Sequence, residues 1–189
     1  MKRALSLSAV AFFATISGPL YASDCPPVAD HGDQIAALLN QARVAPDARS
    51  GQLISNEMWA LWAKAPDEVA QAILDRGMSK RASYDFIGAK ADFDALVSYC
   101  PDYAEGYNQR AFVLFLTQDY EAALADLDRA LERSPTHVAA LAGKALTLMG
   151  LNRLAEGQVL LRQALALNPW LPERSMLLPQ GTPDKDTDL

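Results

Sequence analysis

The stretch DYEAALADLDRALERSP, which runs from Asp119 to Pro135, decides the fold. Its alanines and leucines recur at the three- and four-residue spacing of an amphipathic helix, which predicts a helix over about 120–133. The closing proline lacks a backbone N–H and therefore marks a boundary between two helices. Prolines recur at nearly constant spacing along the chain: Pro66, Pro101, Pro135 and Pro169 stand 35, 34 and 34 residues apart. A period of about 34 residues predicts a stack of similar helical units.

Small and large residues repeat in register with these prolines. The pattern resembles the tetratricopeptide repeat, a helix pair with large residues at positions 4 and 24, small ones at 8, 20 and 27, and proline at 32. In the unit that starts at Ala104 these positions hold, in chain order, Tyr107, Ala111, Ala123, Leu127, Ala130 and Pro135. In the next unit, from Val138, they hold Leu141, Ala145, Gly157, Leu161, Ala164 and Pro169. A weaker unit from Ala70 keeps Ile73, Gly77, Ala89, Phe93 and Pro101, with Leu96 in place of an alanine.

A fourth, degenerate unit starts at Ile35 and includes Leu38, Ala42, Met58 and Pro66. The resemblance implies an all-α solenoid of three to four repeats, because one helix pair cannot bury its apolar face alone. We expect Met58, Trp59, Leu61 and Trp62 to form core between this unit and the first clear repeat; a ligand-binding platform is the alternative. The apolar spacing predicts helices over about 33–45, 52–64, 67–82, 85–98, 103–116, 120–133, 137–149 and 153–167, followed by a capping segment over 170–178.

The N-terminal residues have the order of a secretory signal peptide. Lys2 and Arg3 precede an apolar run, and small residues follow, so we expect cleavage after Ala22. An uncleaved membrane anchor is an alternative, although the run is short for one; a lipoprotein signal is disfavoured because Asp24 directly precedes Cys25. We therefore expect a periplasmic protein, partly from its resemblance to small bacterial envelope proteins. The predicted organisation is signal peptide over 1–22, lead-in and degenerate unit over 23–66, repeats and cap over 67–178, and disordered tail over 179–189.

Two cysteines, Cys25 and Cys100, remain after the predicted cleavage. Export implies an oxidising compartment, so a disulfide between them is the natural prediction. The alternative is two unrelated thiols, with Cys100 a small buried residue.

In tetratricopeptide arrays the first helix of each repeat lines a concave groove. The resemblance assigns a partner-binding groove to Leu74, Met78, Arg81, Glu105, Asn108, Phe112, Phe115, Leu146 and Met149. This mostly apolar set argues against a clamp for a C-terminal carboxylate and favours an apolar peptide or amphipathic helix. Three occupants stay open: the chain's own N-terminal helices, a foreign partner, or a second copy, with homo-oligomerisation not favoured.

Several classes of function are excluded by what the sequence lacks. A net charge of −6 without a basic run argues against nucleic-acid binding. Neither His31 nor His137 has a partner at metal-ligand spacing, and we expect His137 to be solvated in a turn. No phosphate-binding loop or nucleophile elbow occurs, so we predict no catalytic residue, no cofactor and no metal. We expect acidic residues on solvated helix faces, among them Asp119, Asp126 and Asp128.

The sequence therefore predicts a non-enzymatic exported adaptor that holds a partner protein or apolar peptide, with no membrane insertion after signal cleavage. One alternative is a fixed accessory subunit of a cell-envelope complex, bound through a convex or end surface. A second is an enzyme or ligand carrier with a site near Trp59 and Trp62.

Overall fold

The computed structural model describes residues 25–179. The predicted signal peptide, and the predicted tail from residue 180 onward, lie outside this range. None of the helices in the described range is long and apolar enough to cross a membrane. The elements are α1 (Gly32–Val44), α2 (Ala48–Trp62), α3 (Glu68–Ala82), α4 (Phe86–Tyr99), α5 (Ala104–Leu116), α6 (Tyr120–Arg133), α7 (Val138–Gly150), α8 (Leu154–Leu167) and the 3-10 helix η1 (Pro172–Met176).

The expected helices are all present, and the all-α class is confirmed. Most begin within a residue of the expected position, but α2 begins at Ala48 rather than near residue 52. The cause is Asp47, whose carboxylate accepts a hydrogen bond from the Ser50 N–H at 2.8 Å and so caps the helix earlier.

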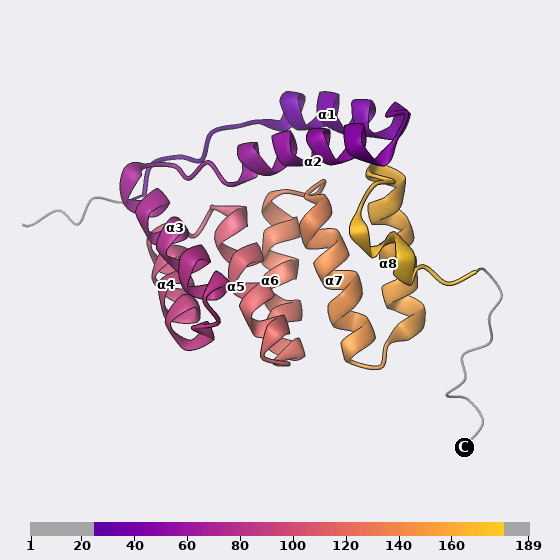
Figure 1. Ribbon diagram of the computed structural model, residues 1–189. Coiled ribbons are helices and arrows are strands. Elements are labelled where there is room, and N and C mark those ends of the chain that lie inside the picture. Colours follow the sequence, from indigo (N-terminus) through magenta and orange to yellow (C-terminus); the bar gives the residue numbers. More distant parts are fainter. Residues whose placement is uncertain (1–24, 180–189) are drawn as a thin grey trace, which may run out of the picture.

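Helices α3 to α8 pack pairwise and stack in chain order, as Figure 1 shows. A Cβ atom on Gly157 would lie 2.7 Å from the Ala145 carbonyl oxygen, and one on Gly77 would lie 2.5 Å from the Phe93 ring. The two helices of a repeat therefore approach so closely that these positions require glycine. The other small residues of the pattern are completely or almost completely buried: Ala89, Ala111, Ala123, Ala130, Ala145 and Ala164. The predicted repeat register is thus confirmed by the packing.

The turn between the two helices of each repeat also recurs. Tyr84, Gln118 and Asn152 adopt left-handed backbone conformations, with φ of 64°, 63° and 60°. These residues occupy the same position in three successive repeats. Because left-handed backbone is unfavourable for residues other than glycine, the repeat imposes this conformation on them.

Ion pairs connect the helices within repeats. Asp126, expected on a solvated face, is only 3% exposed and accepts hydrogen bonds from Arg110 at 2.6 and 2.7 Å. That expectation is wrong because the side chain faces α5 across the helix pair. One repeat earlier, Arg76 and Asp92 form the equivalent pair at 2.8 Å. Burial raises the pKa of Asp92, but hydrogen bonds from Arg76 and Lys80 outweigh it and hold the pKa below its usual value.

The first helix pair does not continue the stack. Helices α1 and α2, which we call the strap (residues 32–62), run along one edge of the array, over the tips of its helices, from α3 to α8 (Figure 1). Their apolar residues share a core with α7, α8 and the cap: Ile35, Leu38, Leu39, Ala42 and Met58 pack with Val138, Leu141, Ala142, Ala164 and Leu171. The predicted fourth pair therefore exists, but its expected place beside the first clear repeat is wrong. By crossing over, the strap covers apolar surface that the last repeat would otherwise expose.

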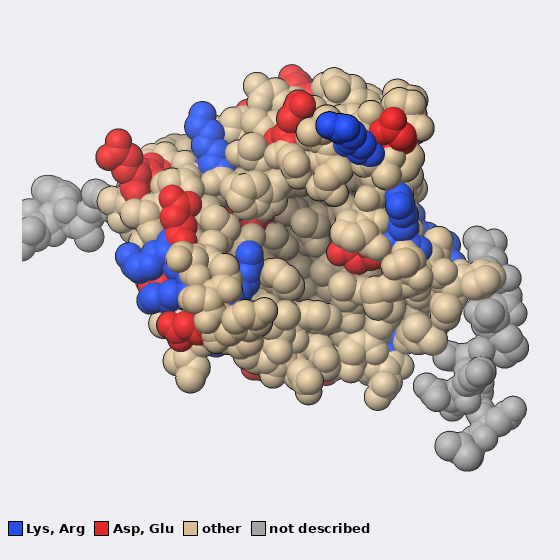
Figure 2. All heavy atoms as spheres, viewed as in Figure 1, with Lys and Arg blue, Asp and Glu red and all other residues tan. Residues whose placement is uncertain are grey.

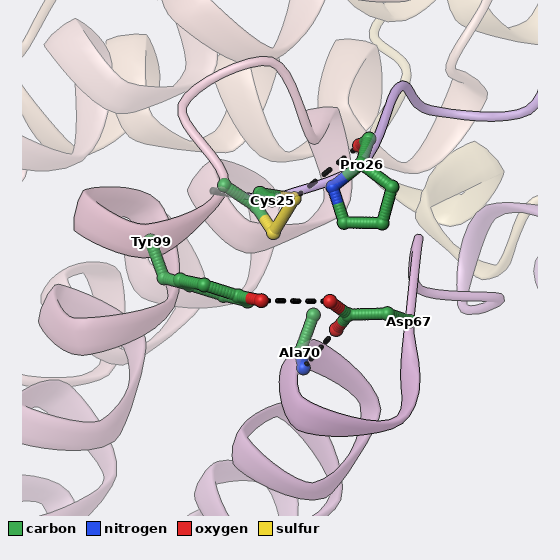
Figure 3. The surroundings of a disulfide bond; sticks show 6 residues. Cys25, Pro26, Asp67, Ala70 and Tyr99 are labelled. Atoms are coloured by element: carbon green, nitrogen blue, oxygen red, sulfur yellow. Dashed lines mark hydrogen bonds between the residues drawn. A yellow bond between two sulfur atoms is a disulfide. The ribbon is translucent and has the colours of Figure 1, made fainter. Parts of the chain in front are cut away.

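A disulfide joins Cys25 to Cys100, which confirms the predicted pairing (Figure 3). It fixes the lead-in to the end of α4, from where residues 25–31 run to α1 without regular structure. The neighbouring Tyr99 hydroxyl donates to Asp67 at 2.7 Å, and Asp67 also accepts from the Ala70 N–H at 2.7 Å. These two bonds, that from Ala70 foremost, lower the pKa of Asp67.

Hydrogen bonds attach the strap to the C-terminal end of the array, just after α8. The Trp170 indole N–H donates to the Ala42 carbonyl at 2.9 Å, and the Asn168 amide donates to the Ser55 hydroxyl at 2.8 Å. At the other end of the strap, the buried Tyr103 hydroxyl donates to the Trp62 carbonyl at 2.8 Å, and burial raises the pKa of Tyr103. The strap is therefore held at both ends.

Candidate functional site

A cavity of about 340 Å³ lies on the concave side of the array, below the strap. Figure 2 shows a hollow near the centre of this face. The volume falls within the range of small-molecule and short-peptide sites. Most of its lining is apolar and comes from α5 and α7, with further residues from α2, α3, α6 and the C-terminal cap: Trp59, Arg81, Asn108, Gln109, Ala111, Phe112, Phe115, Leu127, Ala139, Gly143, Leu146, Thr147, Leu171, Pro172 and Glu173.

Five of the nine predicted groove residues line this cavity: Arg81, Asn108, Phe112, Phe115 and Leu146. Phe112 is 46% exposed, although a phenylalanine in a helix-packed array would ordinarily be buried. The first helices of the repeats therefore present apolar side chains to the concave side, as their spacing predicts.

The other four predicted residues lie elsewhere. Leu74 is completely buried in the core formed by the first two repeats, and Met78 packs against that core. Glu105 is 1% exposed, and Met149 lies against Gly157 inside the last repeat. Leu74 and Glu105 are buried and therefore not available to a partner, and Met78 and Met149, which are partly buried, do not line the cavity.

Glu105 and His137 form a buried pair behind the cavity. The His137 Nε2 lies 2.8 Å from a Glu105 carboxylate oxygen, and the two side chains are 0% and 1% exposed. The Trp62 ring of the strap stacks on the imidazole, with ring centroids 4.1 Å apart. The expectation that His137 is solvated is therefore wrong, because a distant segment of the chain covers its turn.

Arg81 stands at the cavity wall, linked to this buried pair. It donates to the Gln109 carbonyl oxygen, and Gln109 in turn donates to Glu105. The guanidinium carbon lies 4.6 Å from the centroid of the Phe112 ring, a cation–π contact. Burial lowers the pKa of Arg81, and the attraction of Glu105 offsets part of that effect. Within the described residues no carboxylate lies at ion-pair distance from Arg81.

Trp59 and Glu173 belong to the cavity wall but not to the predicted groove set. Trp59, expected in the core, is 44% exposed and lines the cavity from α2. Met58 and Trp62 are packed inward, but against α7, α8 and the cap rather than against the first clear repeat. Glu173 reaches the cavity from η1. No periodic signal marks Glu173, because its position depends on how the cap folds back over the last repeat. Residues 25–179 contain no cluster of three side chains suited to a metal ion.

Comparisons with known sequences agree with this architecture. Residues 114–178 match the family model of the tetratricopeptide repeat. A TPR repeat-containing protein of Rhizobium etli is 29% identical over 122 residues, which is 61% of this chain and 55% of that protein. A tetratricopeptide repeat protein 36 homolog of Nematostella vectensis is 39% identical over 67 residues, 35% of this chain and 37% of that protein. The chain thus spans about half the length of the first relative and less of the second.

Solved structures share the fold. The TPR2B domain of yeast Sti1, in a complex with an Hsp70 peptide, superposes with a TM-score of 0.53 at 22% identity, over 57% of this chain and 89% of that domain. The second TPR domain of human RPAP3, in complex with an HSP70 peptide, superposes with a TM-score of 0.54 at 21% identity, over 58% of this chain and 91% of that domain. Helix pairing, residue register and these similarities show an all-α fold of TPR-like helix pairs, with residues 114–178 similar to the tetratricopeptide-repeat family.

Proposed function

We propose that the protein is a non-enzymatic periplasmic adaptor that holds an apolar segment of a partner polypeptide in the cavity between the array and the strap. The observation that carries the proposal is exposed apolar surface beside a partly roofed cavity. Phe112 and Trp59, which both line the cavity, remain 46% and 44% exposed. Contiguous apolar surface of this kind typically marks a contact site. Peptide complexes of similar TPR domains support a polypeptide as the ligand.

The strap occupies part of the concave side without filling it. Its α2 residue Trp59 borders the cavity, while Phe112 and Leu146 face the cavity from the array. This side of the molecule therefore has room for a foreign partner beside the chain's own helices, which the sequence presents as alternatives.

The periplasmic location rests on the predicted signal peptide. The Cys25–Cys100 disulfide supports it, since disulfides persist in oxidising compartments.

Phe112→Glu tests the proposal. Because the side chain is half-exposed, we expect a melting temperature within about 2 °C of the wild type, since surface changes are worth roughly 0.5 kcal/mol. A partner that co-purifies with the tagged wild-type chain from its native host should be recovered in at least tenfold lower amount with the variant, as quantified by mass spectrometry.

The matched control is Ile87→Glu, an equal change at a residue that is 88% exposed and lines no part of the cavity. This variant should retain the partner. If Phe112→Glu unfolds the protein, the cavity is internal core; if it retains the partner, the contact lies elsewhere. Either outcome would contradict the proposal.

A second candidate is a fixed accessory subunit of a cell-envelope complex. It is favoured by Tyr84, in the turn between α3 and α4, and Ile87, at the start of α4, which are 81% and 88% exposed. Loss of a stoichiometric partner with Ile87→Glu, and not with Phe112→Glu, would support this candidate.

A further inference from the structure

Glu173 is a carboxylate without a counter-charge in the cavity wall. Its Oε2 atom is buried and accepts no hydrogen bond from the residues that the structure describes. Within the same residues, no lysine, arginine or histidine pairs with it. Because burying a charged oxygen without a partner is unfavourable, this position favours a cation or hydrogen-bond donor brought by a ligand.

Arg81 is the opposite charge in the same wall. Gln109 and the Phe112 ring hold its guanidinium in place, yet both are uncharged partners. A guanidinium carries five N–H donors, so most of them remain available to an anion. The amide of Asn108, which also lines the cavity, adds a neutral polar group near this end.

Apolar surface separates the two charged groups. Arg81 comes from α3 and Glu173 from η1, while Phe115 and Leu146 lie on the intervening helices α5 and α7. Figure 2 shows basic and acidic side chains on opposite sides of the hollow. The cavity is thus apolar in its middle and carries one charge of each sign in its wall.

We propose that the cavity recognises an internal polypeptide segment in which a few apolar residues are flanked by one basic and one acidic side chain. The basic side chain pairs with Glu173 and the acidic one with Arg81. The inference rests on the proposed function, namely that this cavity binds a polypeptide, and specifies the class of segment. Charge complementarity carries it, because such a segment satisfies both wall charges while its apolar part covers Phe112 and Phe115.

The probe is a series of peptides with blocked ends, in which two to four leucines separate an N-terminal lysine from a C-terminal aspartate. A second series has the lysine and the aspartate exchanged. A matched series replaces lysine by glutamine and aspartate by asparagine, singly and together. Binding to the full wild-type chain is measured by isothermal titration calorimetry. We expect the best charged peptide to bind at least tenfold more tightly than its neutral counterpart, since charge-assisted hydrogen bonds are the stronger ones.

Two variants assign the charges. Glu173→Gln should remove the preference for lysine over glutamine and leave that for aspartate. Arg81→Met should remove the preference for aspartate alone. Glu132→Gln, a change at a carboxylate whose side chain is 72% exposed and which lines no part of the cavity, is the control and should alter neither preference.

The outcomes separate this inference from the proposed function. If charged and neutral peptides bind the wild type equally, and Phe112→Glu weakens both, the charge inference is overturned and the peptide-binding function stands. If no peptide of the series binds in a way that depends on Phe112, both are overturned. The wild-type comparison needs no variant to fold.

Discussion

Single residues show where sequence spacing predicts the environment and where it does not. Ala123 and Ala145 are small because another helix lies against them, and the 34-residue period alone places them in the core. His137 and Asp126 were expected in solvent and are buried. They are buried because of their partners: Trp62, from a distant helix, stacks on His137, and Arg110, from the facing helix, pairs with Asp126. Periodicity along one helix carries no information about such partners.

Gln118 offers a residue-scale test of the repeat geometry. Its left-handed backbone costs a non-glycine residue about 1–2 kcal/mol, and the flexibility of glycine offsets roughly half of that. We therefore expect Gln118→Gly to stabilise the protein by up to about 1 kcal/mol and raise the melting temperature by roughly 2–4 °C.

Asn152→Gly is the matched control for this prediction. It should give a smaller gain, because asparagine tolerates the left-handed region better than glutamine does. Circular-dichroism melts of both variants measure the effect. Lower melting temperatures for both would contradict the assigned turn conformation.

At the scale of elements, local sequence signals predict where each helix begins and ends, whereas long-range contacts determine where α1 and α2 pack. Apolar spacing and prolines predict the helical segments because capping and periodicity act within one helix. The position of the strap depends on Trp170 and Asn168, which are more than a hundred residues further along the chain. The degenerate unit lacks several of the small residues that a stacked pair needs, which is the one sequence signal that pointed away from regular stacking.

The contact between Gly51 and Trp170 tests the docking of the strap. A methyl group on Gly51 would overlap the Trp170 ring. We expect Gly51→Ala to destabilise the protein by about 1–2 kcal/mol, because overpacking outweighs the gain in helix propensity. Amide hydrogen exchange should become faster in α1 and α2 than in α5 and α6.

Gln52→Ala, a change at the exposed neighbour of Gly51, is the control and should leave the exchange of α1 and α2 unaltered. A Gly51→Ala variant that is more stable than the wild type, with unchanged exchange in the strap, would mean that the strap does not rest on the cap.

In the whole molecule, the N-terminal segment is tied to two distant parts of the array. The disulfide anchors it at α4, and the strap reaches the end of α8. A bridge across 75 residues restricts the unfolded chain, and the chain-entropy model assigns it about 4 kcal/mol. The array is thereby held as one unit around the concave cavity.

The cavity was predicted in part. The position of Phe112 and Leu146 follows from repeat register, because concave positions recur with the period. Trp59 enters from the strap, and the sequence offers it as a ligand-binding residue only as an alternative to core packing. Glu173 enters from the cap, which lies outside the regular repeats, so no periodic signal predicts it. The acidic group of the cavity, Glu173, therefore comes from the cap and not from a repeat.

Site-specific photo-cross-linking in the native host tests the central claim, that the cavity is the contact site, most directly. The photo-reactive residue p-benzoylphenylalanine replaces Leu146, which lines the cavity, or Ile87, which is 88% exposed and lines no part of it. The account predicts that irradiation joins a discrete partner to the chain at position 146, that Phe112→Glu abolishes this product, and that position 87 yields none. Cross-linking of the partner at position 87 and not at position 146 would contradict the account.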